Sequence, residues 1–95
     1  MKIIALEKEK PGIKPDEFQL YLEDEASKVW HLYKEGVIRE IWFRADQNTA
    51  VLVLESDSLN DAEKILNDLP LVKNKLIEFE IIPLKPYTGF ERLFK

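Results

Sequence analysis

The stretch from Gly36 to Glu55, GVIREIWFRADQNTAVLVLE, constrains the fold more than any other part of the chain. Two alternating runs, rich in β-branched and aromatic residues, flank a polar ADQN break, a pattern typical of a β-hairpin. Because side chains alternate between the faces of a strand, pairing across the turn predicts two sets. One set contains Val37, Arg39, Ile41, Phe43, Ala50, Leu52 and Leu54, and the other contains Ile38, Glu40, Trp42, Val51 and Val53.

Both faces of this hairpin are largely apolar, so both need cover. Helices of the same chain can cover one face. A second copy of the chain is the simplest cover for the other, so we predict a homodimer or a larger homo-oligomer built from it.

Length and charge limit the class of protein. Ninety-five residues, 45% of them hydrophobic, predict a single domain spanning residues 1–95. A net charge of -4, with the two signs interspersed, repels phosphate backbones, so we expect no nucleic-acid partner.

The first ten residues contain an apolar run of four, shorter than the apolar region of a signal peptide, and no stretch is long enough to span a membrane. We therefore expect a cytoplasmic protein without a membrane partner. Without cysteine, and with one histidine, we expect no metal site.

The segment before the hairpin predicts a strand and a helix. Residues 2–7 contain a short apolar run bounded by charges, which favours a central strand. Asp16 is the expected N-cap of a helix, with Gln19 completing a capping box, and Gly36 supplies the left-handed residue after its end near Glu35. The inward stripe of this helix contains Phe18, Leu22, Ala26, Val29 and Tyr33.

Glu25 lies on the margin of that stripe. Its carboxylate either reaches solvent or stands at the mouth of a pocket, where burial would raise its pKa.

The segment after the hairpin predicts a second helix and a fourth strand. The helix should run from Leu59 to Leu69 and end at Pro70, followed by a connection to Lys75. Residues 76–82 alternate again, as expected for a strand. Residues 83–95 contain breaking prolines and Gly89, yet are too apolar to stay in water, so we expect this tail to dock on a neighbouring subunit.

The resulting order, βαββαβ, predicts an α+β, ferredoxin-like fold. Two helices would cover one face of a four-stranded antiparallel sheet. Two bare sheet faces would then meet in a dimeric α+β barrel that encloses a partly polar cavity.

The chain resembles the muconolactone isomerase-like family of the dimeric α+β barrel superfamily. The resemblance lies in Gly36 at the helix end, Arg39 and Trp42 on the next strand, and the Leu69-Pro70-Leu71 ending of the second helix. It implies a cofactor-free 1,3-proton shift on a small lactone or related organic acid, with Glu25 where the family has an acidic residue. Ala26 stands where a basic residue is expected, and Lys85-Pro86 replaces a His-Pro pair.

Four further residues are candidate substrate-binding groups: Arg39, Glu40, Trp42 and Glu78. Arg39 could clamp a carboxylate or pair with a local acid, and Trp42 could contact a ligand or form dimer core. The glutamates could serve as acid/base groups or keep edge strands soluble. Three functions follow as hypotheses: a cofactor-independent enzyme, a small-molecule binding module, and an oligomeric structural protein.

Overall fold

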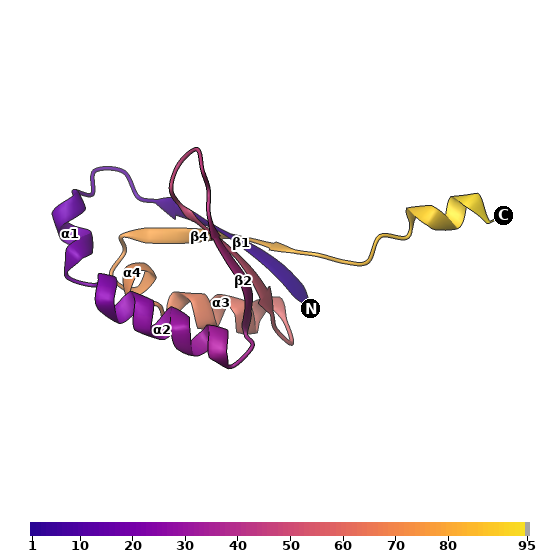
Figure 1. Cartoon of the computed structure of the whole chain (residues 1–95), viewed down its shortest axis with the longest axis horizontal. Coiled ribbons are helices and arrows are strands. Elements are labelled where there is room, and N and C mark those ends of the chain that lie inside the picture. The colour runs from indigo at the N-terminus through magenta and orange to yellow at the C-terminus, as the bar shows by residue number, and fades with distance from the viewer. Residues whose placement is uncertain (95) are drawn as a thin grey trace.

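A four-stranded antiparallel sheet in the order β2-β3-β1-β4 forms the centre of the fold. The computed structural model describes residues 1–94. Its elements follow in the order β1 Lys2–Glu9, α1 Pro15–Gln19, α2 Leu22–Lys34, β2 Ile38–Phe43, β3 Ala50–Glu55, α3 Leu59–Asn67, α4 Pro70–Lys73, β4 Ile77–Pro83 and the 3-10 helix η1 Gly89–Leu93. Helices α2, α3 and α4 lie on the same side of the sheet (Figure 1), which confirms the predicted α+β, ferredoxin-like arrangement.

The main core lies between the sheet and helix α3. Ile3, Ala5, Leu52 and Leu54 from the two central strands are buried against apolar residues of this helix. Ser58 begins α3 as an N-cap, because its Oγ accepts a hydrogen bond from the Asp61 amide at 3.1 Å. The α2 helix contributes no fully buried residue to this core.

The hairpin has the predicted pairing except at its start. Ile41 lies opposite Leu52 and Trp42 opposite Val51, as the alternation predicts. A bulge between Ile38 and Glu40 shifts the register, so Ile38 lies opposite Leu54 and is only 1% exposed. The prediction that placed Ile38 on the same face as Glu40 and Trp42 was therefore wrong, because one extra residue reverses the parity of everything before it.

The first predicted helix is divided in two. A break at Leu20 and Tyr21 separates α1 from α2. The predicted cap at Asp16 was also wrong. Pro15 occupies the first helical position, and the Glu17 carboxylate accepts a hydrogen bond from the Lys14 amide at 3.0 Å. The break lets Phe18 and Tyr21 both pack against the small buried cluster of Leu71, Leu76 and Ile77.

Gly36 ends α2 as predicted. Its φ of +82° is a left-handed conformation that glycine adopts without strain. The amides of Gly36 and Val37 donate hydrogen bonds to the carbonyls of Tyr33 and Leu32, at 3.1 and 3.0 Å. These two bonds form a Schellman motif and fix the turn into β2.

The connection predicted after the second helix contains a further helical turn. Helix α3 ends at Asn67 rather than Leu69, and Pro70 is the first residue of α4. Proline suits this position because it has no backbone amide to leave unpaired. Strand β4 begins and ends one residue later than predicted.

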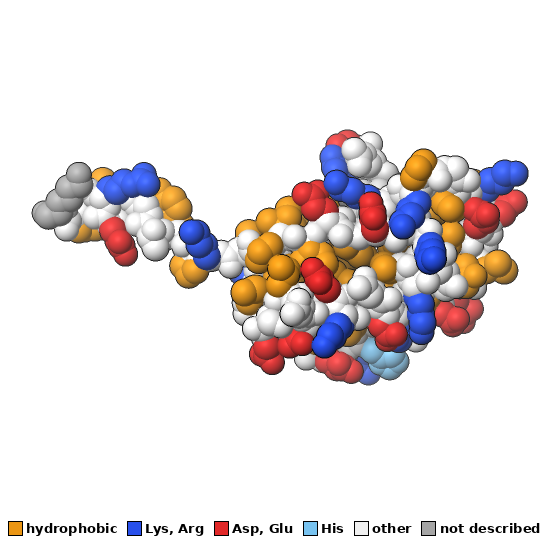
Figure 2. Space-filling view, turned by 180° about the vertical axis from the view of Figure 1, so that it is seen from behind, with side chains coloured by type: hydrophobic (Ala, Val, Ile, Leu, Met, Phe, Trp, Pro, Cys, Tyr) orange, Lys and Arg blue, Asp and Glu red, His pale blue; other side chains and the backbone are white. Residues whose placement is uncertain are grey.

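The tail after β4 extends away from the rest of the chain (Figure 1). Tyr87, Phe90, Leu93 and Phe94 are 68–81% exposed, and hydrophobic side chains are visible along the tail in Figure 2. The ring of Phe90 packs edge-on against Tyr87, with 5.1 Å between the centroids. The final residue of the predicted docking segment, Lys95, lies outside the described residues. Docking on a neighbouring subunit stays a prediction. Within residues 1–94, none of the helices is long and apolar enough to cross a membrane.

Candidate functional site

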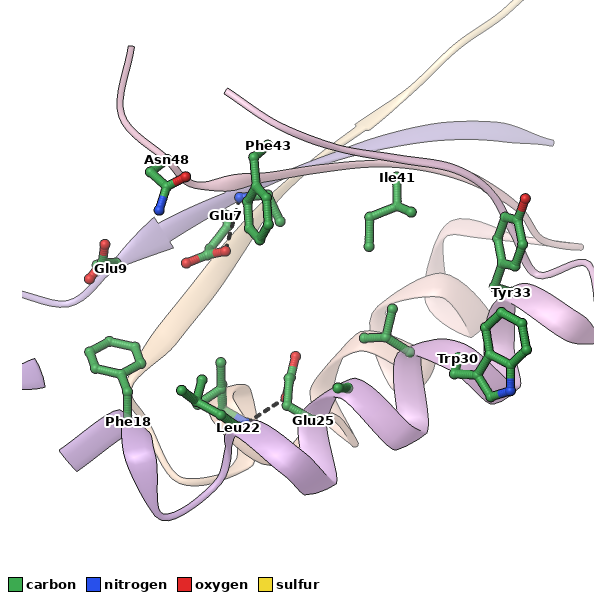
Figure 3. Close-up of a pocket in the computed structure, with 14 residues that line it drawn as sticks. Glu7, Glu9, Phe18, Leu22, Glu25, Trp30, Tyr33, Ile41, Phe43 and Asn48 are labelled. Atoms are coloured by element: carbon green, nitrogen blue, oxygen red, sulfur yellow. Dashed lines mark hydrogen bonds between the residues drawn. The ribbon is translucent and has the colours of Figure 1, made fainter. Parts of the chain in front are cut away.

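A pocket of about 640 Å³ lies between α2 and the sheet. Four residues of the predicted inward stripe lie on α2 and line this space: Leu22, Ala26, Val29 and Tyr33. The apolar wall contains Phe18, Leu22, Val29, Trp30, Ile41 and Phe43 (Figure 3). The volume is within the range of sites that hold small organic molecules.

Glu25 projects from α2 into this pocket (Figure 3). Its Oε1 accepts a hydrogen bond from the backbone amide of Leu71 at 2.9 Å. Burial raises the pKa of the Glu25 carboxyl above its ordinary value, the Leu71 bond opposes the rise, and the nearby Glu7 carboxylate adds to it. The sequence left two positions open for the Glu25 carboxylate, in solvent or at the mouth of a pocket. In the structure it lies at a pocket.

Glu7 projects into the same pocket from β1, on the opposite wall (Figure 3). Its Oε1 accepts a hydrogen bond from the Ala50 amide at 3.0 Å. Burial raises the pKa of the Glu7 carboxyl, the Ala50 bond opposes the rise, and the charge of Glu9 adds to it. Glu7 was not predicted from the sequence as a site residue. Alternation places Glu7 on the same face of β1 as Ile3 and Ala5, and only the folded structure shows that helices cover this face.

Two half-buried carboxyl groups therefore face one apolar space. They come from elements that are separated along the chain and that only the fold brings together. Two acids in such a site do not ionise independently, because the first negative charge makes the second less favourable. One protonated and one ionised carboxyl group is the arrangement that general acid/base chemistry requires.

Trp30 and Tyr33 stand at one end of the pocket. Their rings stack with 6.1 Å between the centroids, and the Lys34 ammonium lies 5.9 Å from the centre of the Trp30 ring. Both rings are about half exposed, which leaves an aromatic surface open at this end.

The four predicted substrate-binding residues lie outside this pocket. Glu40 and Trp42 lie on the sheet face away from the helices, where the Trp42 indole donates to the Glu40 carboxylate at 3.1 Å. Glu78 is on β4, opposite Lys8 in the register. Arg39 donates to the carbonyl of Gly36 at the bulge. The structure thus does not bring these four residues together with Glu25 in one chain, and their binding role stays a prediction.

The helix-covered position of the pocket also differs from the predicted one. A cavity between two sheets was predicted from the sequence, and a single chain does not test it. Within the described residues, no group of three or more His, Cys, Asp or Glu side chains could hold a metal ion.

Comparison with known proteins agrees with this fold. The family model for muconolactone delta-isomerase matches residues 4–89. The chain belongs to the muconolactone delta-isomerase family. This result confirms the resemblance found in the sequence.

Two solved structures resemble this member of the family in fold. Muconolactone isomerase has a TM-score of 0.76 and 21% identity, with 94% of this chain and 93% of that chain covered. The 5-chloro-2-hydroxyhydroquinone dehydrochlorinase TftG from Burkholderia phenoliruptrix AC1100, in complex with 2,5-dihydroxybenzoquinone, has a TM-score of 0.64 and 16% identity. That comparison covers 94% of this chain and 98% of the dehydrochlorinase. No curated protein sequence matches the chain.

Proposed function

We propose that this protein is an isomerase that moves a proton within a small lactone, using Glu25 and Glu7 as its acid/base groups. The observation that carries the proposal is the pair of half-buried carboxyl groups facing one apolar pocket. Membership in the muconolactone delta-isomerase family supports it.

The reaction needs two proton transfers. In the first, the ionised Glu25 carboxylate takes a proton from the carbon next to the lactone carbonyl, and the C–H electron pair moves into an enolate. Glu7, in its protonated form, donates a hydrogen bond to the carbonyl oxygen where negative charge develops. In the second, Glu25 returns the proton to the far carbon of the conjugated system, so the double bond moves and no atom is gained or lost.

Each carboxyl group has one oxygen available for this work. Within the described residues, the Glu25 and Glu7 hydrogen bonds to backbone amides use Oε1. The second oxygen of each group can face a ligand while the amide holds the side chain in position. The mechanism as proposed uses these side chains alone and assigns no step to a cofactor.

The test uses α-angelica lactone, an uncharged lactone whose double bond moves into conjugation by a 1,3-proton shift. We expect the protein to accelerate this conversion, measured by proton NMR, above the rate in buffer. Replacing Glu25 with Gln should remove about 100-fold or more of the rate, which is the usual contribution of a positioned acid/base group. Glu23→Gln is the matched control, because Glu23 is an exposed acid on the same helix.

If the wild-type protein does not exceed the buffer rate, or if Glu25→Gln is as active as Glu23→Gln, the proposal is wrong. A pocket that binds lactone without converting it would instead support the non-catalytic binding module.

We further propose that the chain forms a homodimer or a larger homo-oligomer. Trp42 is 61% exposed on the uncovered sheet face, beside half-buried apolar side chains such as Val51 and Val53. An aromatic and aliphatic surface of this kind is typical of an interface. In such a dimer, Glu40, Trp42 and Glu78 would line the space between two sheets, where a ligand-binding role for them becomes possible.

A further inference from the structure

The charged side chains that line the pocket are all acidic, and Trp30, Tyr33 and Asn48 add neutral polar groups. Three glutamates line it: Glu7, Glu9 and Glu25. Among the described residues that line the pocket there is no Lys, Arg or His, and Asn48 contributes the one side-chain amide. A ligand that enters this space therefore meets negative charge and hydrogen-bonding oxygen without a cationic partner.

Backbone hydrogen bonds hold the carboxyl groups of Glu7 and Glu25 in the pocket. Each is held at one oxygen by a backbone amide from a different element, Leu71 for Glu25 and Ala50 for Glu7. Glu25 is attached to α2 and Glu7 to β1, so the two carboxyl groups lie on opposite walls (Figure 3). A negatively charged group placed between these walls is repelled by whichever of the two carboxyl groups is ionised.

The walls between the carboxyl groups would also withhold solvation from an anion. Leu22, Val29, Ile41 and Phe43 supply apolar surface there, and none of them carries a donor that could replace lost water. An uncharged ring loses little by entering such a space, and its carbonyl oxygen can accept a hydrogen bond from a protonated glutamate.

We propose that the pocket selects uncharged carbonyl compounds, such as lactones without a carboxylate substituent, and rejects the corresponding carboxylates. The inference rests on the proposed function for the identity of the site and adds the charge of its substrate. The acidic lining with no basic side chain and the apolar walls between the glutamates carry it.

A matched set of ligands tests this preference for uncharged compounds over carboxylates, which we call the charge rule. The test measures binding alone, so the outcome does not depend on catalysis. Coumarin is an uncharged aromatic lactone, coumarin-3-carboxylate adds one negative charge, and an aminomethyl coumarin adds one positive charge. Binding to the full-length protein is measured by amide NMR titration. Coumarin should shift the Leu71 and Ala50 amides, and the carboxylate should bind at least about tenfold more weakly, which corresponds to about 1.4 kcal/mol.

Variants identify the source of the discrimination. In the double variant Glu7→Gln with Glu25→Gln, the carboxylate should gain affinity relative to coumarin, because both substitutions remove negative charge. Both amide side chains keep an oxygen for the backbone bonds, so the pocket should keep its shape. Glu23→Gln removes one charge from the exposed side of α2 and should leave the ratio unchanged.

Equal or tighter binding of the carboxylate overturns the inference and indicates that a cation reaches the pocket, for example Arg92 from the tail of another copy. Tighter binding of the amine than of coumarin also overturns it, because the glutamates would then act as a cation site. Both results are separate from the α-angelica lactone assay. Failure of that assay with the charge rule intact would remove the isomerase and leave a selective binding pocket.

Discussion

The Glu25 carboxylate caps helix α4 by accepting a hydrogen bond from the Leu71 amide, with 2.9 Å between Oε1 and the nitrogen. Leu71 is the second residue of α4, and the N-cap position before this helix is occupied by Leu69, whose side chain cannot accept a bond. Glu25 therefore joins two helices whose residues are 46 positions apart, besides facing the pocket. Structural and chemical roles of this side chain must be separated by the choice of substitution.

The two roles predict different results for two Glu25 variants. Glu25→Gln keeps an oxygen for the Leu71 amide, so its stability should stay close to that of the wild type while isomerase activity is lost. Glu25→Leu leaves the buried Leu71 amide without its acceptor and should cost about 1–2 kcal/mol of unfolding free energy. Chemical denaturation of both variants beside Glu23→Gln measures the difference. Equal stabilities of the Gln and Leu variants would show that the capping bond contributes nothing.

The raised pKa values of Glu7 and Glu25 predict a pH-dependent stability. The folded protein holds these protons more tightly than the unfolded chain, whose carboxyl groups titrate near the ordinary value of 4.5. The contribution to stability is thus fully present below pH 4.5 and is lost as the pH rises through the folded pKa values.

Thermal unfolding from acidic to neutral pH checks this sign. The melting temperature of the wild type should fall relative to that of the Glu7→Gln, Glu25→Gln double variant as the pH rises above 4.5. The difference between the two melting temperatures cancels the contribution of titrating groups that both proteins share. One such group is Asp68, whose pKa is lowered by the Lys28 ammonium. A difference that is constant over this range, or that has the opposite sign, would contradict the raised pKa values.

The bulge predicts that Ile38 contributes more to stability than Ile41. Ile38 is 1% exposed in the core, whereas Ile41 is 44% exposed beside the pocket. Ile38→Ala should cost about 2–4 kcal/mol because it leaves a cavity among packed residues. Ile41→Ala should cost less than half as much. Denaturant unfolding of the two variants measures both losses of free energy. If Ile38 faced solvent, as uninterrupted alternation requires, Ile41→Ala would be the more costly substitution.

If the uncovered sheet face is the dimer interface, a charge placed on it should weaken assembly. Trp42→Glu places a charge on the uncovered face and should shift the oligomer toward monomer in sedimentation velocity. Glu78→Gln on the same face removes a charge and serves as its control. A wild-type protein that sediments as a folded monomer at micromolar concentration would exclude the homodimer.

Deletion of residues 89–95 tests the tail separately. The removed segment carries Phe90, Leu93 and Phe94, all of which are exposed in the single chain. If these side chains dock on a neighbouring subunit, the truncated protein should form a weaker assembly and melt at a lower temperature. Unchanged assembly and stability would show that the tail docks nowhere.

Features set by neighbouring residues were predicted from the sequence alone. The turn at Gly36 depends on a glycine at a left-handed position, and the start of α3 depends on the Ser58 hydroxyl three residues before an amide. The order of strands and helices follows from periodicity in the same way. These signals are local, so they are visible in the chain before any tertiary contact forms.

The candidate site was predicted in part. Glu25 was identified because its helix has a clear apolar stripe, and a carboxylate at the stripe's margin is unusual. Glu7 was missed because a strand assumed to be covered on both faces gives no reason to single out one charged residue. The pairing partners of β1 decide that Glu7 points toward α2, and these lie far along the chain.

The sequence by itself determined the order of the four strands and the two main helical segments, because dihedral preference and hydrophobic periodicity act over a few residues. Only the tertiary structure decided which side chains meet. The bulge before Glu40 turned Ile38 into the core, and packing of Phe18 and Tyr21 divided the first helix. The space left between α2 and the sheet brought Glu7 and Glu25 together. These outcomes depend on contacts between distant segments, whose energies are settled by the packing of the whole domain.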